Sequence, residues 1–115
     1  PPEVEAALAE LLAQCDQDPL RAPTLEQIRE AGLSDAHLAA AARLGRIFLP
    51  APGVVLPADA ARLALHTLRT LPQPFTTSEA RKALGTSRRV AIPILEFLDR
   101  ARATRRLADD RREVR

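Results

Sequence analysis

Residues 76–111 have the sequence TTSEARKALGTSRRVAIPILEFLDRARATRRLADDR, and this stretch decides the predicted fold. Thr76 followed three residues later by Glu79 is the pattern of a capping box at a helix start, and Gly85 is a typical helix end. A second helix begins after Thr86 and Ser87. Its apolar positions recur at helical spacing, which predicts one inward face. We expect that face to consist of Val90, Ile94, Leu98 and Ala101.

Two short extended segments then flank a turn. Residues 103–107 and 111–115 lie on either side of Ala108-Asp109-Asp110, and aspartates favour turns. The stretch therefore predicts a helix-turn-helix followed by a β-hairpin wing.

The same order of elements occurs 52 residues earlier. Five positions correspond at this spacing, namely Thr24, Gln27, Arg29, Ala31 and Ser34 with Thr76, Glu79, Arg81, Ala83 and Thr86. Thr24 and Gln27 again predict a capping box, with Leu25 and Ile28 facing inward. Residues 47–49 and 54–56 predict a first hairpin. We therefore predict a mainly α fold with small β-hairpins, made of two tandem winged-helix units, residues 1–57 and 58–115.

Each predicted unit begins with a further helix. Residues 3–17 form an amphipathic helix with Cys15 on its apolar face as a core residue. The second such helix follows Pro57 and stops before Pro72. Proline is tolerated near a helix start because the backbone N–H that it lacks would be unpaired there. Its inward positions are Ala61, Ala64, Leu65, Leu68 and Leu71. We also expect Phe48, Phe75 and Phe97 in the core.

Composition limits the class of protein. Residues 1–57 carry 4 Arg against 8 acids, and residues 58–115 carry 12 Arg and Lys82 against 7 acids, which favours a single basic binding face. The single cysteine excludes an internal disulfide and fits a cytoplasmic location. No apolar run approaches the ~20 residues that span a bilayer, and no signal peptide pattern occurs. We expect a monomer that does not associate with a membrane.

Patterns for catalysis are absent from the sequence. There is no phosphate-binding P-loop motif, and His37 and His66 have no second ligand at metal-binding spacing. Glu79 is explained as a cap and Asp109-Asp110 as a turn. We therefore expect a binding module without a catalytic site, a metal or a cofactor.

The strongest functional signal is a difference in charge between two equivalent helix starts. A helix N-terminus carries about half a positive charge, so acids stabilise it and bases destabilise it by ~0.3–1 kcal/mol each. Ser34 is followed by Asp35, whereas Thr86-Ser87 is followed by Arg88-Arg89. Two guanidinium groups suit that position if a phosphate docks there on the backbone N–H groups. The alternative is that both arginines extend into solvent.

Further arginines surround the last predicted turn: Arg102, Arg105 and Arg106 before it, and Arg111, Arg112 and Arg115 after it. We expect this ribbon to lie beside the start of the helix that begins near residue 88. The helix end and the wing would then form one basic clamp for a polyanion.

The type of nucleic acid follows from the rest of that helix. Reading helices lie along the major groove of DNA with polar side chains toward base edges. Here Pro93 interrupts the hydrogen-bond ladder, and Glu96 and Asp99 on the exposed flank would repel a groove wall. We therefore expect contact through the helix tip, which suits a structured RNA. The absence of Tyr and Trp argues against a base-stacking platform.

Four segments carry a resemblance to a known family: Phe75-Thr76, residues 83–89 (ALGTSRR), residues 93–100 (PILEFLDR), and Thr104-Arg105-Arg106 with Asp109-Asp110-Arg111. They resemble the last winged-helix domain of SelB, the bacterial selenocysteine-specific elongation factor. Over residues 1–74, only the order of elements resembles the preceding winged-helix domain. The family's C-terminal winged helices bind the selenocysteine insertion hairpin of the mRNA, and its GTPase and tRNA-binding domains lie upstream.

The resemblance implies which residues bind. Ser87, Arg88 and Arg89 would contact the RNA backbone, and Arg105, Arg106 and Arg111 would line the wing side of the site. With Thr86 and Arg102, these are the candidate RNA-binding residues. The sequence departs from the family at Ala108, where Gly is usual, and at Val90, where an aromatic residue is common.

We therefore predict binding to an mRNA stem-loop that tethers a selenocysteine-specific, GTP-binding elongation factor to its recoding site, with the ribosome reached through the full-length protein. The residues leave two alternatives open. One is a transcription regulator that binds duplex DNA, and the other is a winged-helix protein-interaction module. We expect the acidic first unit to act as a spacer that packs against the second.

Overall fold

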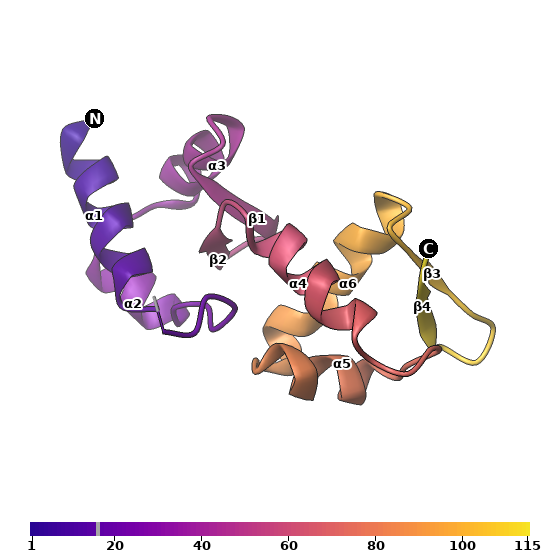
Figure 1. The fold of residues 1–115 in the computed structure, drawn as a ribbon. Coiled ribbons are helices and arrows are strands. Elements are labelled where there is room, and N and C mark those ends of the chain that lie inside the picture. Colours follow the sequence, from indigo (N-terminus) through magenta and orange to yellow (C-terminus); the bar gives the residue numbers. More distant parts are fainter. Residues whose placement is uncertain (16) are drawn as a thin grey trace.

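The computed structural model describes residues 1–15 and 17–115, which are mainly helical with two small antiparallel hairpins (Figure 1). Three helices and a hairpin come first: α1 Pro2–Ala13, α2 Leu25–Glu30, α3 Asp35–Arg43, β1 Ile47–Ala51 and β2 Val54–Pro57. Three helices and a hairpin follow: α4 Ala60–Arg69, α5 Thr77–Leu84, α6 Arg88–Arg100, β3 Thr104–Arg106 and β4 Arg112–Val114. The predicted mainly helical fold with small β-hairpins and the predicted order of elements are confirmed.

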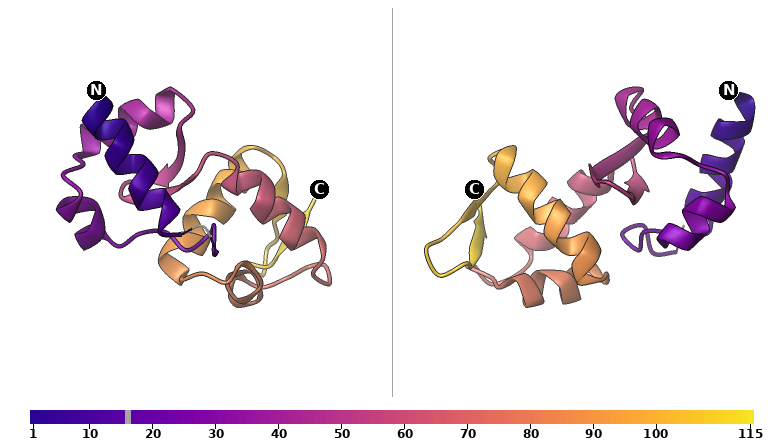
Figure 2. Two further views of the ribbon diagram at one scale, coloured as in Figure 1. Left: turned by 60° about the vertical axis from the view of Figure 1, so that its left-hand side comes forward. Right: turned by 180° about the vertical axis from the view of Figure 1, so that it is seen from behind.

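The molecule is elongated, with extents of 44 × 24 × 20 Å. Helices α1 to α3 occupy one end, the β3–β4 hairpin occupies the other, and α4 to α6 lie between them (Figures 1 and 2). Helix α6 begins on the side facing the loop between α1 and α2 and ends beside β3. The two ends of α6 therefore face different parts of the chain.

Local capping explains where the short helices start. The Thr24 and Thr76 hydroxyls each accept a hydrogen bond at 3.1 Å, from the backbone N–H of Gln27 and Glu79 respectively. The Gln27 and Glu79 side chains return the bond to the cap backbone at 2.8 Å, so both predicted capping boxes are confirmed. Ser34 caps α3 in the same way, with His37 Nδ1 as the reciprocal acceptor. Each box satisfies two N–H groups that a helix start leaves unpaired.

Two hydrophobic clusters hold the fold, and strand β2 contributes to both. Successive side chains of a strand point to opposite faces. Val55 accordingly packs with α1 to α3, in a cluster that includes Leu8, Leu11, Ile28 and Leu38. Val54 and Leu56 pack in the larger cluster with α4 to α6, and Leu20 of the α1–α2 loop joins them. The two halves of the chain are therefore joined by buried apolar side chains.

The three phenylalanines lie in or against the larger cluster, as predicted. Phe75 is buried, and the half-buried rings of Phe48 and Phe97 meet edge to face with centroids 4.7 Å apart. This pair joins β1 to α6.

Several local predictions at the first half are wrong. The helix predicted over residues 3–17 ends at Ala13, and Cys15 lies half-buried in the following turn instead of in a helical core stripe. Residue 16 of that predicted helix lies outside the described residues. Leu25, predicted to face inward, is 55% exposed, and its side chain lies over the turn at Gly53, where the missing Cβ leaves room for it.

The second half departs less from expectation. Pro57 ends β2, and α4 begins three residues later, at Ala60. Ala64 and Leu68 of its predicted inward stripe are buried, and Ala61, Leu65 and Leu71 are partly buried. Ala101 is exposed because it caps the end of α6 and is not part of its inward face.

The capping box of α5 makes the stability of the fold depend on pH through Glu79. Hydrogen bonds from the backbone and the side chain of Thr76 hold the pKa of Glu79 below its ordinary value of 4.5, and Arg111 and Lys82 add to this effect. A carboxyl group whose folded-state pKa is depressed stabilises the fold above its unfolded pKa, and this stabilisation is lost as the pH falls through the folded pKa.

Glu79→Gln keeps an acceptor for the Thr76 N–H but cannot titrate. We expect the variant's melting temperature to lie below that of the wild type at pH 6 and the difference to shrink steadily between pH 5 and pH 2. Melting curves of both proteins across that range check this. A difference that stays constant with pH would contradict it.

Candidate nucleic-acid interface

The start of α6 lacks the side-chain caps found at α2, α3 and α5. Ser87 occupies the cap position with extended backbone angles (φ −90°, ψ 163°), but its hydroxyl makes no capping bond and the first turn contains no acid. In the described part of the chain, no acceptor is found for the backbone N–H groups of Ser87, Arg88 and Arg89. Such a helix end carries a partial positive charge and can bind a phosphate group.

The two adjacent arginines at this end have different environments. Arg88 is exposed and makes no ion pair or side-chain hydrogen bond within the described residues. The Arg89 guanidinium donates to the backbone carbonyl of Pro23 at 3.0 Å and to that of Gly53 at 3.4 Å. Arg88 is therefore available to a ligand, whereas Arg89 is engaged with the α1–α2 loop and the β1–β2 turn.

Thr86 lies in the turn that joins α5 to α6. Gly85 ends α5 with a left-handed backbone (φ 65°), which favours glycine. The Thr86 backbone N–H donates to the Arg81 carbonyl at 3.3 Å, and the Arg81 side chain donates to the Thr86 carbonyl at 3.5 Å. These bonds fix the turn that aims the start of α6.

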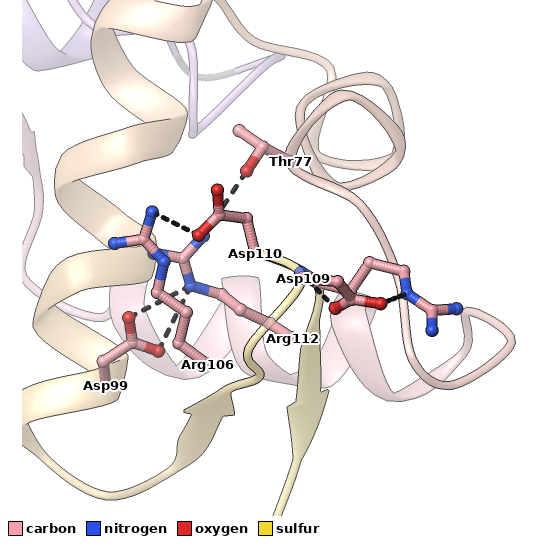
Figure 3. Close-up of polar contacts among 7 residues, drawn as sticks. Thr77, Asp99, Arg106, Asp109, Asp110 and Arg112 are labelled. Atoms are coloured by element: carbon pink, nitrogen blue, oxygen red, sulfur yellow. Dashed lines mark hydrogen bonds and ion pairs between the residues drawn. The ribbon is translucent and has the colours of Figure 1, made fainter.

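Three of the predicted wing arginines form ion pairs within their own hairpin, and Figure 3 shows the pair between Arg106 and Asp110. Arg106 pairs with Asp110 at 3.1 Å, Arg111 pairs with Asp109 at 2.7 Å, and Arg105 pairs with Glu113. The hydrogen bonds from Arg111 lower the pKa of Asp109. All three arginines are exposed, and exposed pairs contribute about 1 kcal/mol or less, so a phosphate can compete for them.

Arg102 differs from the other wing arginines. It follows α6 with a left-handed backbone (φ 60°), is exposed, and has no ion-pair partner in the part of the chain that the structure describes. The predicted basic surface thus includes two unpaired arginines, Arg88 and Arg102, at opposite ends of α6.

The inclusion of Arg112 in the basic clamp is wrong. Its side chain is 5% exposed, and its Nε lies 3.0 Å from a carboxylate oxygen of Asp99, a residue near the end of α6 (Figure 3). The guanidinium also donates to the Thr77 hydroxyl at 3.4 Å, and Asp99 accepts a further bond at 2.6 Å from the buried Thr104 hydroxyl. Asp99 is therefore not an exposed acid on the flank of α6, and the pair anchors the hairpin.

The hairpin's base also lies elsewhere than predicted. It packs against the last turns of α6 through Asp99 and against the start of α5 through Thr77 and a backbone bridge between Phe75 and Arg112. Helix α6 has 13 residues, which at ~1.5 Å per residue separates its ends by about 20 Å. The helix tip and the hairpin base are therefore separate, and one clamp requires a ligand long enough to span them.

Sequence reasoning missed a basic residue from the first half. Arg21, in the α1–α2 loop, lines the same cleft as Ser87 and Arg89. No sequence signal distinguishes Arg21, because only the packing of the two halves brings it to the tip of α6.

Other site types find no support in the described residues 1–15 and 17–115. They contain no group of three or more His, Cys, Asp or Glu side chains arranged to hold a metal ion. None of their helices has the length and apolar character needed to cross a membrane.

Three helices followed by an antiparallel hairpin, with an uncapped basic helix tip, define a winged-helix protein. Residues 66–112 match the family model described as elongation factor SelB, winged helix. No curated protein sequence matches the chain.

Two solved structures have the same fold. One is the mRNA-binding domain of elongation factor SelB from E. coli in complex with SECIS RNA, with a TM-score of 0.73 and 23% identity over 98% of this chain and 97% of that chain. The other is the bacterial selenocysteine-specific elongation factor EF-Sec, with a TM-score of 0.73 and 18% identity over 97% of this chain. The chain covers 19% of that elongation factor's length.

Proposed function

We propose that this chain binds an mRNA stem-loop, the selenocysteine insertion element, and so tethers a selenocysteine-specific elongation factor to its recoding site in the cytoplasm. Its residues 1–57 and 58–115 act as two winged-helix units. The second unit contacts RNA through Thr86, Ser87 and Arg88 at the tip of α6. Arg102, Arg105, Arg106 and Arg111 supply the wing side. The fragment acts as a monomeric binding module and the chemistry belongs to the rest of the factor.

One observation carries the proposal: among the described residues, the exposed Arg88 has no ion-pair partner, and it stands on a helix end whose first backbone N–H groups find no acceptor there. An arginine placed there without a partner costs stability, which a bound phosphate offsets. The likeness to an mRNA-binding domain solved with SECIS RNA and the family match over residues 66–112 support RNA as that ligand.

The spacing of the basic groups also supports a folded RNA. The tip and the end of α6 lie about 20 Å apart, so a ligand that contacts Arg88 and Arg102 must be rigid over that distance. A stem-loop meets this requirement, whereas a flexible single strand loses entropy on binding. The exposed Glu96 between them disfavours burying the side of α6 in a DNA groove.

A titration of the chain against three ligands tests the proposal: a stem-loop with a bulged base, a linear RNA of the same composition, and the matching duplex DNA. We expect the tightest binding to the stem-loop, with log K falling linearly as log salt rises. A preference for the duplex would instead support a transcription regulator. Negligible RNA affinity would support a protein-interaction module.

A further inference from the structure

A cleft of about 500 Å³ lies between the α1–α2 loop and the first turn of α6. The loop side carries Arg21 and Asp18, and the helix side carries Ser87 and Arg89. The loop belongs to residues 1–57, the acidic half of the chain, and the helix tip belongs to residues 58–115, the basic half. The cleft is large enough to admit a phosphodiester group beside the uncapped helix end.

The backbone around Arg21 is fixed on both sides. Leu20 is 7% exposed and belongs to the larger hydrophobic cluster, against which Ala22 also packs. Pro23 is buried, and its carbonyl accepts the hydrogen bond from Arg89 at 3.0 Å. The Arg21 N–H closes a turn onto the Asp18 carbonyl at 2.9 Å. An exposed side chain therefore extends from an ordered backbone.

Arg21 itself has no internal role that accounts for its position. Its side chain is exposed and makes no ion pair or hydrogen bond within the described residues, although Asp18 lines the same cleft. A cation on a preordered loop binds a phosphate with a smaller loss of entropy than one on a mobile segment.

We infer that Arg21 is a further contact for the RNA backbone, and that Arg89 is a positioning residue that holds the Arg21 loop beside the tip of α6. The inference rests on the proposed function and assigns the first half a part in binding. Arg88 and Arg89 then have different tasks, since Arg88 meets the RNA and Arg89 joins the two halves of the chain.

Asp18 gives the inference an internal check. It is half-buried and its carboxylate lies near Gly85, so it repels a phosphate that enters the cleft. Replacing this acid with its neutral isostere should therefore strengthen binding if the phosphate lies where we place it.

The first experiment measures stem-loop affinity against salt for Arg21→Gln, Asp18→Asn and the control Arg43→Gln. Arg43 is an exposed arginine of the same half, on α3, and does not line the cleft. We expect R21Q to weaken binding about five- to tenfold and to reduce the log–log salt slope by about one unit. D18N should strengthen binding and R43Q should change neither quantity. Equal effects of R21Q and R43Q would overturn the inference.

A double-mutant cycle tests the task of Arg89. Arg89→Met removes both hydrogen bonds to the α1–α2 loop and the β1–β2 turn. In that background we expect R21Q to change affinity less than about twofold, because the loop is no longer held, whereas Arg88→Gln should keep its full effect. An undiminished effect of R21Q would show that Arg89 does not position it.

These results separate the inference from the proposed function. Loss of binding in R88Q with no effect of R21Q would overturn the inference and leave the proposed function standing. No effect of either variant, with circular dichroism showing both folded, would overturn both.

Discussion

Arg88→Glu should weaken binding of the stem-loop by about 2–4 kcal/mol while leaving the fold intact. A charge-assisted hydrogen bond to phosphate is worth about 1.5–3 kcal/mol, and the new carboxylate adds repulsion. The fold should persist because Arg88 is exposed and has no partner in the described part of the chain. An acid in the first turn also interacts favourably with the helix dipole, so we expect a small rise in melting temperature.

The combination of weaker binding and equal or higher stability distinguishes a binding residue from a structural one. Fluorescence anisotropy with a labelled stem-loop measures the affinity, and thermal unfolding measures the stability. Arg43→Glu is the matched control, because it makes the same charge reversal on an exposed arginine of α3. If both reversals weaken binding equally, only net charge matters and the tip of α6 is not a site.

The local parts of the fold could be predicted from the sequence because their causes are local. A capping box needs only Thr76 and Glu79, three residues apart, and a left-handed helix end needs only Gly85. Leu25 shows the limit of this reasoning. Helical spacing alone places it toward the core, but its side chain is 55% exposed and lies over the Gly53 turn, 28 residues away in the sequence.

The roles of the individual arginines could not be predicted either, because they also depend on contacts between residues that are distant in the sequence. Arg111 and Arg112 are neighbours in one basic run, yet Arg111 is exposed and Arg112 is buried against Asp99. Arg111 precedes β4 and bonds to Asp109 of the turn, whereas Arg112 begins β4 and pairs with Asp99 at the end of α6.

Arg88 and Arg89 are also neighbours in the sequence. They differ because the Arg89 guanidinium donates to the backbone carbonyls of Pro23 and Gly53, whereas Arg88 extends into solvent. The packing of the α1–α2 loop accounts for the difference between Arg88 and Arg89. A cluster of arginines in a sequence therefore predicts a basic surface, but it does not show which of those arginines are exposed on it.

The largest loss of folding stability is expected when the buried ion pair between Arg112 and Asp99 is broken. Removing one partner of a buried ion pair leaves the other charge without compensation, which costs about 3–5 kcal/mol. Arg112 is 5% exposed and Asp99 is 23% exposed, so the guanidinium is the group that water cannot reach. We therefore expect Asp99→Ala to destabilise the fold by about 3 kcal/mol and Arg112→Met by less, because water can partly solvate the remaining carboxylate.

The double variant distinguishes this ion pair from ordinary packing. Replacing both partners by apolar residues removes the unpaired charge, so Asp99→Leu with Arg112→Met should be more stable than Asp99→Ala alone. Urea unfolding of Asp99→Leu, Arg112→Met and the double variant measures the coupling, and simple additivity of these single changes would contradict the role assigned to the pair. Because the pair anchors the hairpin to α6 and α5, Asp99→Ala should also weaken stem-loop binding. The double variant should recover stability but only part of the affinity, since an apolar contact holds the hairpin in place without the directional bonds that orient the wing.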